Sequence, residues 1–556
     1  MSDAALTVEA RMPASLGGAI AEKLDRAAQD RVAERVRAGD ATLWGPTGAA
    51  EIADRLGWLT TVERMLGEVD SLTSFSERVR DDGLRDVVLL GMGGSSLAPE
   101  VLRRSFGPRP DRPALHVLDS TDAATVRAVQ ERIDARRTLF LVSSKSGGTI
   151  EPLSLFAHFW SLVGDGQNFA AITDPGSGLQ KLAHEHGFRE VFAGDPNIGG
   201  RYSALSPFGI VPAALIGVDV VALLQGAHGA WDTALQDLSS EATTQPSASG
   251  DLGAATWMGA ALSALAQSGR DKLTFVISPS LPGLGLWLEQ LVAESTGKRS
   301  TGILPVAEEP LGAPEHYGED RVFAYLPDAD APDVELDARV AALADAGHPL
   351  LRIPTRGRSD LGRVFMLAEL AVAVAGWGLE INPFDQPNVQ QAKDATKQVL
   401  ADCQAKQELP ELADADDAAL KALLAPAAPP DYVAIMGYVQ PSAQFDAAIA
   451  ELRVAVRAAG RATTTFGYGP RFLHSTGQFH KGGPRTGRFL QLLHDGPQDV
   501  GIPGAAYTFT TLKNAEAIGD LQTLRELGLP AERVRLDGDD PVGALEDLIE
   551  RIKEAL

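Results

Sequence analysis

A loop rich in hydroxyl groups and glycine occupies residues 143–152, between a predicted strand and the start of a predicted helix. Amide groups at a helix N-terminus point outward with partial positive charge, and serine and threonine hydroxyls add further donors. Glycines let the backbone approach an anion closely. We therefore predict a phosphate-binding loop that uses Ser144, Lys145, Ser146 and Thr149. The spacing is not that of a P-loop, and simple N-capping is the alternative interpretation.

A second glycine–serine loop, Gly91–Pro99, follows the predicted strand at residues 86–90. A dinucleotide-binding fingerprint would need a third glycine where the chain has Ser96, so an NAD-dependent oxidoreductase is disfavoured. Capping alone poorly explains two such loops after neighbouring strands. We therefore expect Gly94 and Ser95 to bind the same phosphate as the first loop.

Short apolar runs that alternate with helical stretches must position these loops, and they fall into three sets along the chain. Buried apolar strands between helices are typical of parallel sheets that are covered on both faces. The predicted strands are 86–90, 115–118, 138–142, 169–172, 272–277, 302–306, 321–326, 349–353, 432–436, 461–466, 505–510 and 533–536. Residues 360–377 and 397–424 are predicted to be helical.

The sequence thus predicts an α/β protein with two doubly wound parallel-sheet domains, at residues 81–235 and 236–424. A helical segment at residues 1–80 precedes them. The proline-rich stretch 425–431 is predicted to be a linker, because proline clusters break helices and stiffen connections. It leads to an α/β appendix at residues 431–556.

Composition and charge limit the classes of protein to which the chain can belong. It has 556 residues, of which 44% are hydrophobic, and this is enough for large buried cores. The net charge of −24 disfavours nucleic acid and anionic membranes as partners, and we find neither a membrane-spanning run nor a secretion signal. A single cysteine, Cys403, excludes an internal disulfide, and the histidines form no metal-binding motif. We therefore expect a cytoplasmic protein without a metal.

Five segments, taken together, are similar to the motifs of one enzyme family. They read GMGGS at 91–95, SSKSGGTIEP at 143–152, DPNIGGRYSALSPFG at 195–209, LEQLVAESTGK at 288–298 and NPFDQPNVQQAK at 382–393. In this order they resemble the glucose-6-phosphate isomerase family, whose domains are of the sugar isomerase (SIS) type. Over its whole length the chain most resembles the isomerase half of the bifunctional transaldolase/glucose-6-phosphate isomerases, without the transaldolase barrel.

The resemblance implies interconversion of glucose 6-phosphate and fructose 6-phosphate through a cis-enediol, with no cofactor. A base must move a proton between adjacent carbons, and the charge on the enediol oxygen must be stabilised. By resemblance, Glu294 is the base, Arg201 stabilises the enediolate and Lys393 opens the sugar ring. Gln386, in the same motif as Lys393, is expected to bind the substrate. The alternatives are an Arg201 that pairs with Asp195, and ordinary surface positions for Glu294 and Lys393.

The ring-opening histidine of the family is out of its usual place in this sequence. The usual window after the catalytic glutamate contains His316, whose neighbours do not match the motif. The match is His474, within LHSTGQ of the appendix, and His316 or no histidine at all is the alternative. His480 is weighed as a second contact against an ordinary loop histidine. A catalytic His474 would require the appendix to pack over the cleft between the two sheets.

The net charge also bears on substrate capture, because a dianionic sugar phosphate must be held by a protein of charge −24. Screening confines such interactions to about 8 Å at physiological salt, so nearby amides, hydroxyls and cations must hold the substrate. A non-catalytic phosphosugar-binding protein and an isomerase that also accepts mannose 6-phosphate are the alternative functions. A homodimer is implied by the family alone, and the sequence leaves open a separate or fused transaldolase as a partner.

Overall fold

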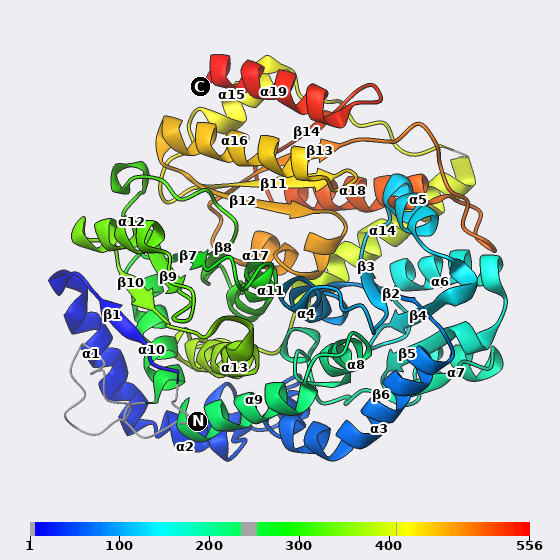
Figure 1. Cartoon of the computed structure of the whole chain (residues 1–556). Coiled ribbons are helices and arrows are strands. Elements are labelled where there is room, and N and C mark those ends of the chain that lie inside the picture. Colours follow the sequence, from blue (N-terminus) through cyan, green and yellow to red (C-terminus); the bar gives the residue numbers. More distant parts are fainter. Residues whose placement is uncertain (1–5, 235–252, 407) are drawn as a thin grey trace.

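The computed structural model describes residues 6–234, 253–406 and 408–556, and these contain three sheets (Figure 1). The first domain lies on the right of the view, the second lies on the left, and the C-terminal domain covers both from above. The N-terminal helices run along the lower edge. The α/β class that the alternating runs predict is confirmed.

The first sheet has the strand order β3-β2-β4-β5-β6, and all of its neighbouring strands are parallel. The buried central strands explain the uninterrupted apolar runs. The strands are β2 (Asp86–Gly91), β3 (Ala114–Leu118), β4 (Thr138–Ser143), β5 (Phe169–Thr173) and β6 (Glu190–Ala193). The helices are α4 (Leu97–Phe106), α5 (Ala123–Arg132), α6 (Ile150–Val163), α7 (Gly178–Glu185) and α8 (Pro207–Leu215). Both predicted phosphate loops therefore leave the sheet at adjacent carboxyl ends, where the winding direction switches.

The second sheet has the order β1-β10-β9-β7-β8, with β1 antiparallel at its edge. Its strands are β1 (Glu9–Arg11), β7 (Lys272–Ile277), β8 (Leu304–Val306), β9 (Arg321–Leu326) and β10 (Leu350–Arg352). Its helices are α9 (Val220–Ala234), α10 (Ala254–Gln267), α11 (Leu284–Thr296), α12 (Val334–Asp345) and α13 (Leu361–Gly378). The short strand β1 was missed, because its sequence of alternating polar residues carries no apolar run.

Three N-terminal helices cover the lower side of these two sheets, namely α1 (Ala14–Gln29), α2 (Val32–Arg37) and α3 (Thr61–Asp81). Helix α13 is the centre of the largest hydrophobic core, and every residue along it is buried. By length and composition alone, the stretch Gly357–Gly378 could cross a membrane, but the whole of α13 within it is buried inside the protein. Its apolar sequence is therefore explained by the core that it forms.

The C-terminal domain has a third parallel sheet, in the order β12-β11-β13-β14. Its strands are β11 (Tyr432–Tyr438), β12 (Thr463–Tyr468), β13 (Gly487–Leu493) and β14 (Ala531–Arg535). Its helices are α16 (Ala443–Gly460), α17 (Gly477–Gly482), α18 (Phe509–Glu526) and α19 (Pro541–Ala555), and α14 (Pro387–Lys406) and α15 (Asp417–Leu424) lead into it. The three sheets share one strand order. When the strands of each sheet are numbered along the chain from its first long strand, their order across the sheet begins 2-1-3-4.

Two sequence predictions in this part of the chain are wrong. Residues 505–510 do not form a strand, because Thr508 caps α18 and the helix starts at Phe509. The third strand of the sheet is β13 instead, whose apolar run is interrupted by Arg488 and Gln491. The predicted helix at residues 397–424 is in fact two helices, α14 and α15.

Buried ion pairs join the C-terminal domain to both of the others. Lys513 of α18 lies 3.1 Å from the carboxylate of Asp122 in the first domain, and both side chains are buried. Arg457 of α16 lies 3.4 Å from the carboxylate of Glu309, which is buried beside the second sheet. Removing one partner of a buried ion pair leaves an uncompensated charge, which is strongly destabilising. The C-terminal domain is therefore a fixed part of the folded protein.

Candidate active site

A cavity of about 180 Å³ lies where β2 and β4 end. Its walls come from the first domain, from α11 of the second and from the C-terminal domain. Most of the predicted site residues line it, namely Gly94, Ser95, Ser144, Lys145, Ser146, Thr149, Glu294, Gln386, Lys393 and His474. Arg201 does not line it but is fully buried directly behind the wall, and its neighbour Gly200 faces the cavity. The predicted residues thus come together at one place, the position where ligands bind in doubly wound sheets.

The hydroxyl groups of the two phosphate loops are not used to cap helices. Thr149 precedes α6 without a hydrogen bond from its side chain to the helix, and its hydroxyl lies 3.4 Å from that of Ser144. Ser146 is exposed at the mouth of the cavity. Ser96 precedes α4, again without a side-chain cap, and its buried hydroxyl donates to the carbonyl of Gly93 and to Asp119. The N-capping interpretation therefore does not account for these residues, and the hydroxyls of Ser144, Ser146 and Thr149 are placed to meet an anion.

Glycines allow three segments of the chain to meet at the cavity. A Cβ on Gly94 would lie 2.1 Å from the carbonyl oxygen of Gly200. A Cβ on Gly93, which has a φ of +56°, would lie 2.5 Å from the carbonyl oxygen of His474. That same oxygen accepts a hydrogen bond of 2.8 Å from the side chain of Gln290 on α11. The backbone of His474 is therefore held against the first and second domains at once.

Lys145 does not present a free charge to the cavity. Its ammonium group forms an ion pair with Asp174 and donates a hydrogen bond of 3.1 Å to the carbonyl of Pro196. Asp174 therefore compensates the charge of Lys145, although other atoms of the lysine line the cavity. The phosphate end of the cavity is thus built mainly from neutral hydroxyl and amide donors.

Glu294 projects from α11 into the cavity and is almost completely buried. Burial raises the pKa of its carboxyl group above the ordinary value, although the positive charge of Arg201 and a hydrogen bond from Gln290 pull in the opposite direction. A carboxylate with a raised pKa is a stronger base than an exposed one. This environment suits a group that must take a proton from carbon.

Arg201 is held by five hydrogen bonds, one for each N–H of its guanidinium group. It donates to the Glu294 carboxylate at 3.2 Å, to Gln386 Oε1 at 2.7 Å and to Ser295 Oγ at 2.9 Å. The other two bonds reach the carbonyls of Pro383 and Asp385. Its donors are therefore all occupied. Arg201 orients Glu294 and Gln386, and its positive charge acts on the cavity without direct contact.

Arg201 does not pair with Asp195, the alternative partner that the sequence suggested. Asp195 instead accepts a hydrogen bond of 3.2 Å from Arg64 of α3. To contact an enediolate directly, Arg201 would have to exchange one of its five bonds, and two of them, to Glu294 and Gln386, reach residues that line the cavity.

His474 forms a pair with a carboxylate that the sequence analysis did not single out. Its Nε2 lies 2.6 Å from Oε1 of Glu151, which stands in the first turn of α6. The charge of His474 holds the pKa of Glu151 below its ordinary value, although burial acts in the opposite direction. An acidic residue in a first helical turn is common, because it complements the helix dipole, so the sequence alone gave no distinct signal. A histidine oriented by a carboxylate is an effective acid and base.

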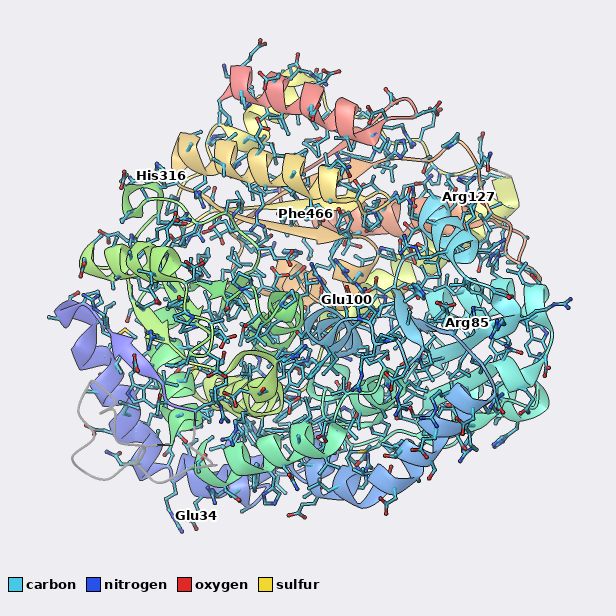
Figure 2. All side chains as sticks on the ribbon, viewed as in Figure 1. Glu34, Arg85, Glu100, Arg127, His316 and Phe466 are labelled. Carbon is cyan, nitrogen blue, oxygen red and sulfur yellow. The ribbon has the colours of Figure 1, made fainter. Side chains whose placement is uncertain are left out.

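The two other histidines that the sequence analysis weighed lie elsewhere. His316 is exposed and lies at the outer left edge of the molecule (Figure 2), away from the lining of the cavity. His480 is buried in the C-terminal domain, where its Nδ1 lies 3.0 Å from the hydroxyl of Tyr432. His480 is therefore not the second contact that the sequence analysis considered.

His480 is expected to make folding sensitive to acid. Burial lowers its pKa to about 3, so the folded protein keeps the imidazole neutral while the unfolded chain binds a proton below about pH 6.5. Stability is therefore complete above that pH and is lost as the pH falls, by about 2 kcal/mol at about pH 5. Urea unfolding of wild type and His480→Gln is measured at about pH 6.5 and about pH 5. The free energy of unfolding should depend less on pH in the variant. The exposed His228→Gln is the control, and an unchanged dependence in His480→Gln would contradict the prediction.

Residues 17–314 match the family model described as phosphoglucose isomerase, which is more than half of the chain. The chain belongs to the phosphoglucose isomerase family. A glucose-6-phosphate isomerase of Rubrobacter xylanophilus is 29% identical over 420 residues, covering 66% of this chain and 92% of the relative. One of Thermosynechococcus vestitus is 30% identical over 364 residues, covering 57% of this chain and 66% of the relative.

Solved structures of similar fold support the membership. A Thermus thermophilus protein described as hypothetical has a TM-score of 0.55 and 26% identity, covering 70% of this chain and all of its own. A glucose-6-phosphate isomerase of Chlamydia trachomatis has a TM-score of 0.51 and 20% identity, covering 68% and 79%. At that identity the likeness concerns the fold alone.

The family match includes the two phosphate loops, Arg201 and Glu294, but ends before three of the predicted residues. Gln386, Lys393 and His474 lie outside the matched residues, but they line the same cavity as Glu294. Among the described residues, no group of histidine, cysteine, aspartate and glutamate side chains is arranged to hold a metal ion.

Proposed function

We propose that this protein interconverts glucose 6-phosphate and fructose 6-phosphate, with Glu294 moving a proton between C1 and C2 of the open-chain sugar. The observation that carries the proposal is the arrangement of one cavity. It brings together a buried carboxylate, a histidine that is paired with another carboxylate, and two loops of phosphate-binding type. A base of this kind contributes about 10²- to 10⁴-fold to the rate.

The phosphate group of the substrate would be held by the loops after β2 and β4. Ser95, Ser144, Ser146 and Thr149 supply hydroxyl donors, and the backbone near Gly94 supplies amide groups. Because the protein carries a net charge of −24, these short contacts must provide the binding energy that long-range attraction does not.

Ring opening would be the work of His474 and Lys393, which line the same cavity as Glu294. The imidazole, oriented by Glu151, can take the proton of the O1 hydroxyl group, while Lys393 can give a proton to the ring oxygen. The negative charge of the enediolate would then be stabilised by the buried guanidinium group of Arg201 and by Gln386, which Arg201 orients.

The alternative functions make different demands on the cavity. A non-catalytic phosphosugar-binding protein needs the two loops, but it does not need a buried base held by a buried arginine. Isomerisation of mannose 6-phosphate as well would use the same residues. A cytoplasmic location, a homodimer and a separate or fused transaldolase partner remain predictions from the sequence.

The direct test is a coupled assay of the purified full-length chain. Fructose 6-phosphate is supplied, and glucose 6-phosphate is detected with a dehydrogenase that is specific for it. We expect conversion in both directions without an added metal or cofactor. Mannose 6-phosphate, supplied in parallel, measures the scope of the reaction. Binding of fructose 6-phosphate without turnover would favour the non-catalytic alternative.

A further inference from the structure

A second cavity, of about 280 Å³, adjoins the first behind the ring-opening residues. The two cavities share Ser146, Thr149, Lys393 and His474 as lining residues. Two carboxyl groups face the second cavity, one from Glu151 of α6 and the other from Glu516 of α18. The C-terminal domain thus brings an acidic side chain, as well as the histidine, to the active site.

Glu516 is buried, and its two oxygens have different surroundings. Oε2 accepts a hydrogen bond of 2.7 Å from the hydroxyl of Thr121, which precedes α5. Oε1 is buried with no hydrogen-bond partner among the described residues. A buried carboxylate with one oxygen unsatisfied is costly, whereas a protonated carboxyl places an O–H at that oxygen and carries no charge.

The charged groups around Glu516 do not neutralise it. On its own helix, Lys513 pairs with Asp122 and Asp495, and Asp520 pairs with Lys481. The titratable groups that face it from other elements are Glu151 on α6, His474 before α17, Lys393 and Lys397 on α14, Tyr438 on β11, and Tyr507 before α18. Among these, Glu151 is the nearest source of negative charge that acts on Glu516.

The two carboxyl groups are driven to opposite protonation states. Burial and the charge of Glu151 raise the pKa of Glu516 well above its ordinary value, and the hydrogen bond from Thr121 only partly opposes this. The neighbouring His474 lowers the pKa of Glu151. Pairs of carboxyls whose environments separate their pKa values are typical of acid–base sites.

We propose that Glu516 is a positioning residue that stays protonated, so that the cavity behind His474 carries the single negative charge of Glu151. This inference rests on the proposed function, because it concerns ring opening by His474. A second negative charge in this cavity would repel the dianionic substrate that must lie against His474. Ionisation of Glu516 at alkaline pH is therefore expected to slow ring opening.

The test combines a spectroscopic and a kinetic measurement on the full-length protein. Infrared difference spectra between wild type and Glu516→Gln should show the carbonyl-stretch band of a protonated carboxylic acid at neutral pH. Ring opening is measured as exchange between the anomers of glucose 6-phosphate, by NMR. We expect the wild-type exchange rate to decline at alkaline pH together with the band, and Glu516→Gln to move this decline to higher pH. Glu526→Gln, the same substitution at the exposed end of α18, should leave the profile unchanged.

A second variant keeps the inference testable if Glu516→Gln does not fold. Thr121→Val removes the hydrogen bond that favours the ionised form of Glu516, so it should also move the decline to higher pH. A neutral-pH spectrum without the band, or variants whose decline coincides with that of the wild type, would overturn the inference. Failure of the wild type to isomerise fructose 6-phosphate would instead overturn the proposed function.

Discussion

Glu294→Gln is expected to abolish isomerisation while leaving ring opening in place. The amide cannot take a proton from carbon, so the rate of fructose 6-phosphate conversion should fall by about 10²- to 10⁴-fold. Exchange between the anomers of glucose 6-phosphate uses His474 and Lys393 instead of Glu294 and should continue. The coupled assay measures the first rate, and NMR exchange spectroscopy measures the second.

Glu289→Gln is the matched control for this variant. Glu289 is a second buried glutamate on α11, and it accepts a hydrogen bond of 3.1 Å from the backbone of Ala307 instead of facing the cavity. Burial raises its pKa to about 8, so it is already mostly protonated at neutral pH and an amide resembles it closely. We expect almost wild-type turnover. Equal turnover in Glu294→Gln and wild type would refute the assignment of the base.

Loss of His474 is expected to have the second large effect, because the chain would then lack the base that opens the ring. His474→Gln in the full-length protein should slow both anomer exchange and isomerisation by about 100-fold or more. Removing the whole C-terminal domain after residue 425 should abolish activity for the same reason. It would also leave Asp122 without Lys513 and remove Arg457 from Glu309, which keeps its pair with Arg321, so the point variant is the cleaner measurement.

His316→Gln is the control for this second prediction, since His316 is the other histidine that the sequence offered. It is exposed and does not line the cavity, so turnover should stay at the wild-type level. Wild-type turnover after truncation at residue 425, or a slow His316→Gln with a fast His474→Gln, would contradict the assignment of His474.

The phosphate loops were readable from the sequence because everything that shapes them is local. A buried strand, a glycine turn and a helix start follow one another within about a dozen residues, and the two loops recur on adjacent strands. The base Glu294 was found only through its motif, since a glutamate near a helix end is usually a surface residue. The fold class followed from the alternation of apolar runs and helices.

The features that were missed depend on contacts between distant parts of the chain. The strand β13 was overlooked because Gln491 interrupts its apolar run, and the buried amide of Gln491 donates a hydrogen bond to the carbonyl of Ala517 on α18. Glu151 stands inside a quoted motif, but its partner His474 is 323 residues away. The five bonds that occupy Arg201 likewise come from residues that follow it by 93 to 185 positions.

The split of the active site between the first and last domains has a consequence for synthesis on the ribosome. The phosphate loops and Glu294 are in place once the first two domains have emerged, whereas His474 follows 96 residues behind the end of α13 and is locked by contacts that α18 completes. A nascent chain that has not yet reached the C-terminal domain therefore lacks the ring-opening histidine, however well its earlier domains have folded. Catalysis begins only when the C-terminal domain has been synthesised and has folded.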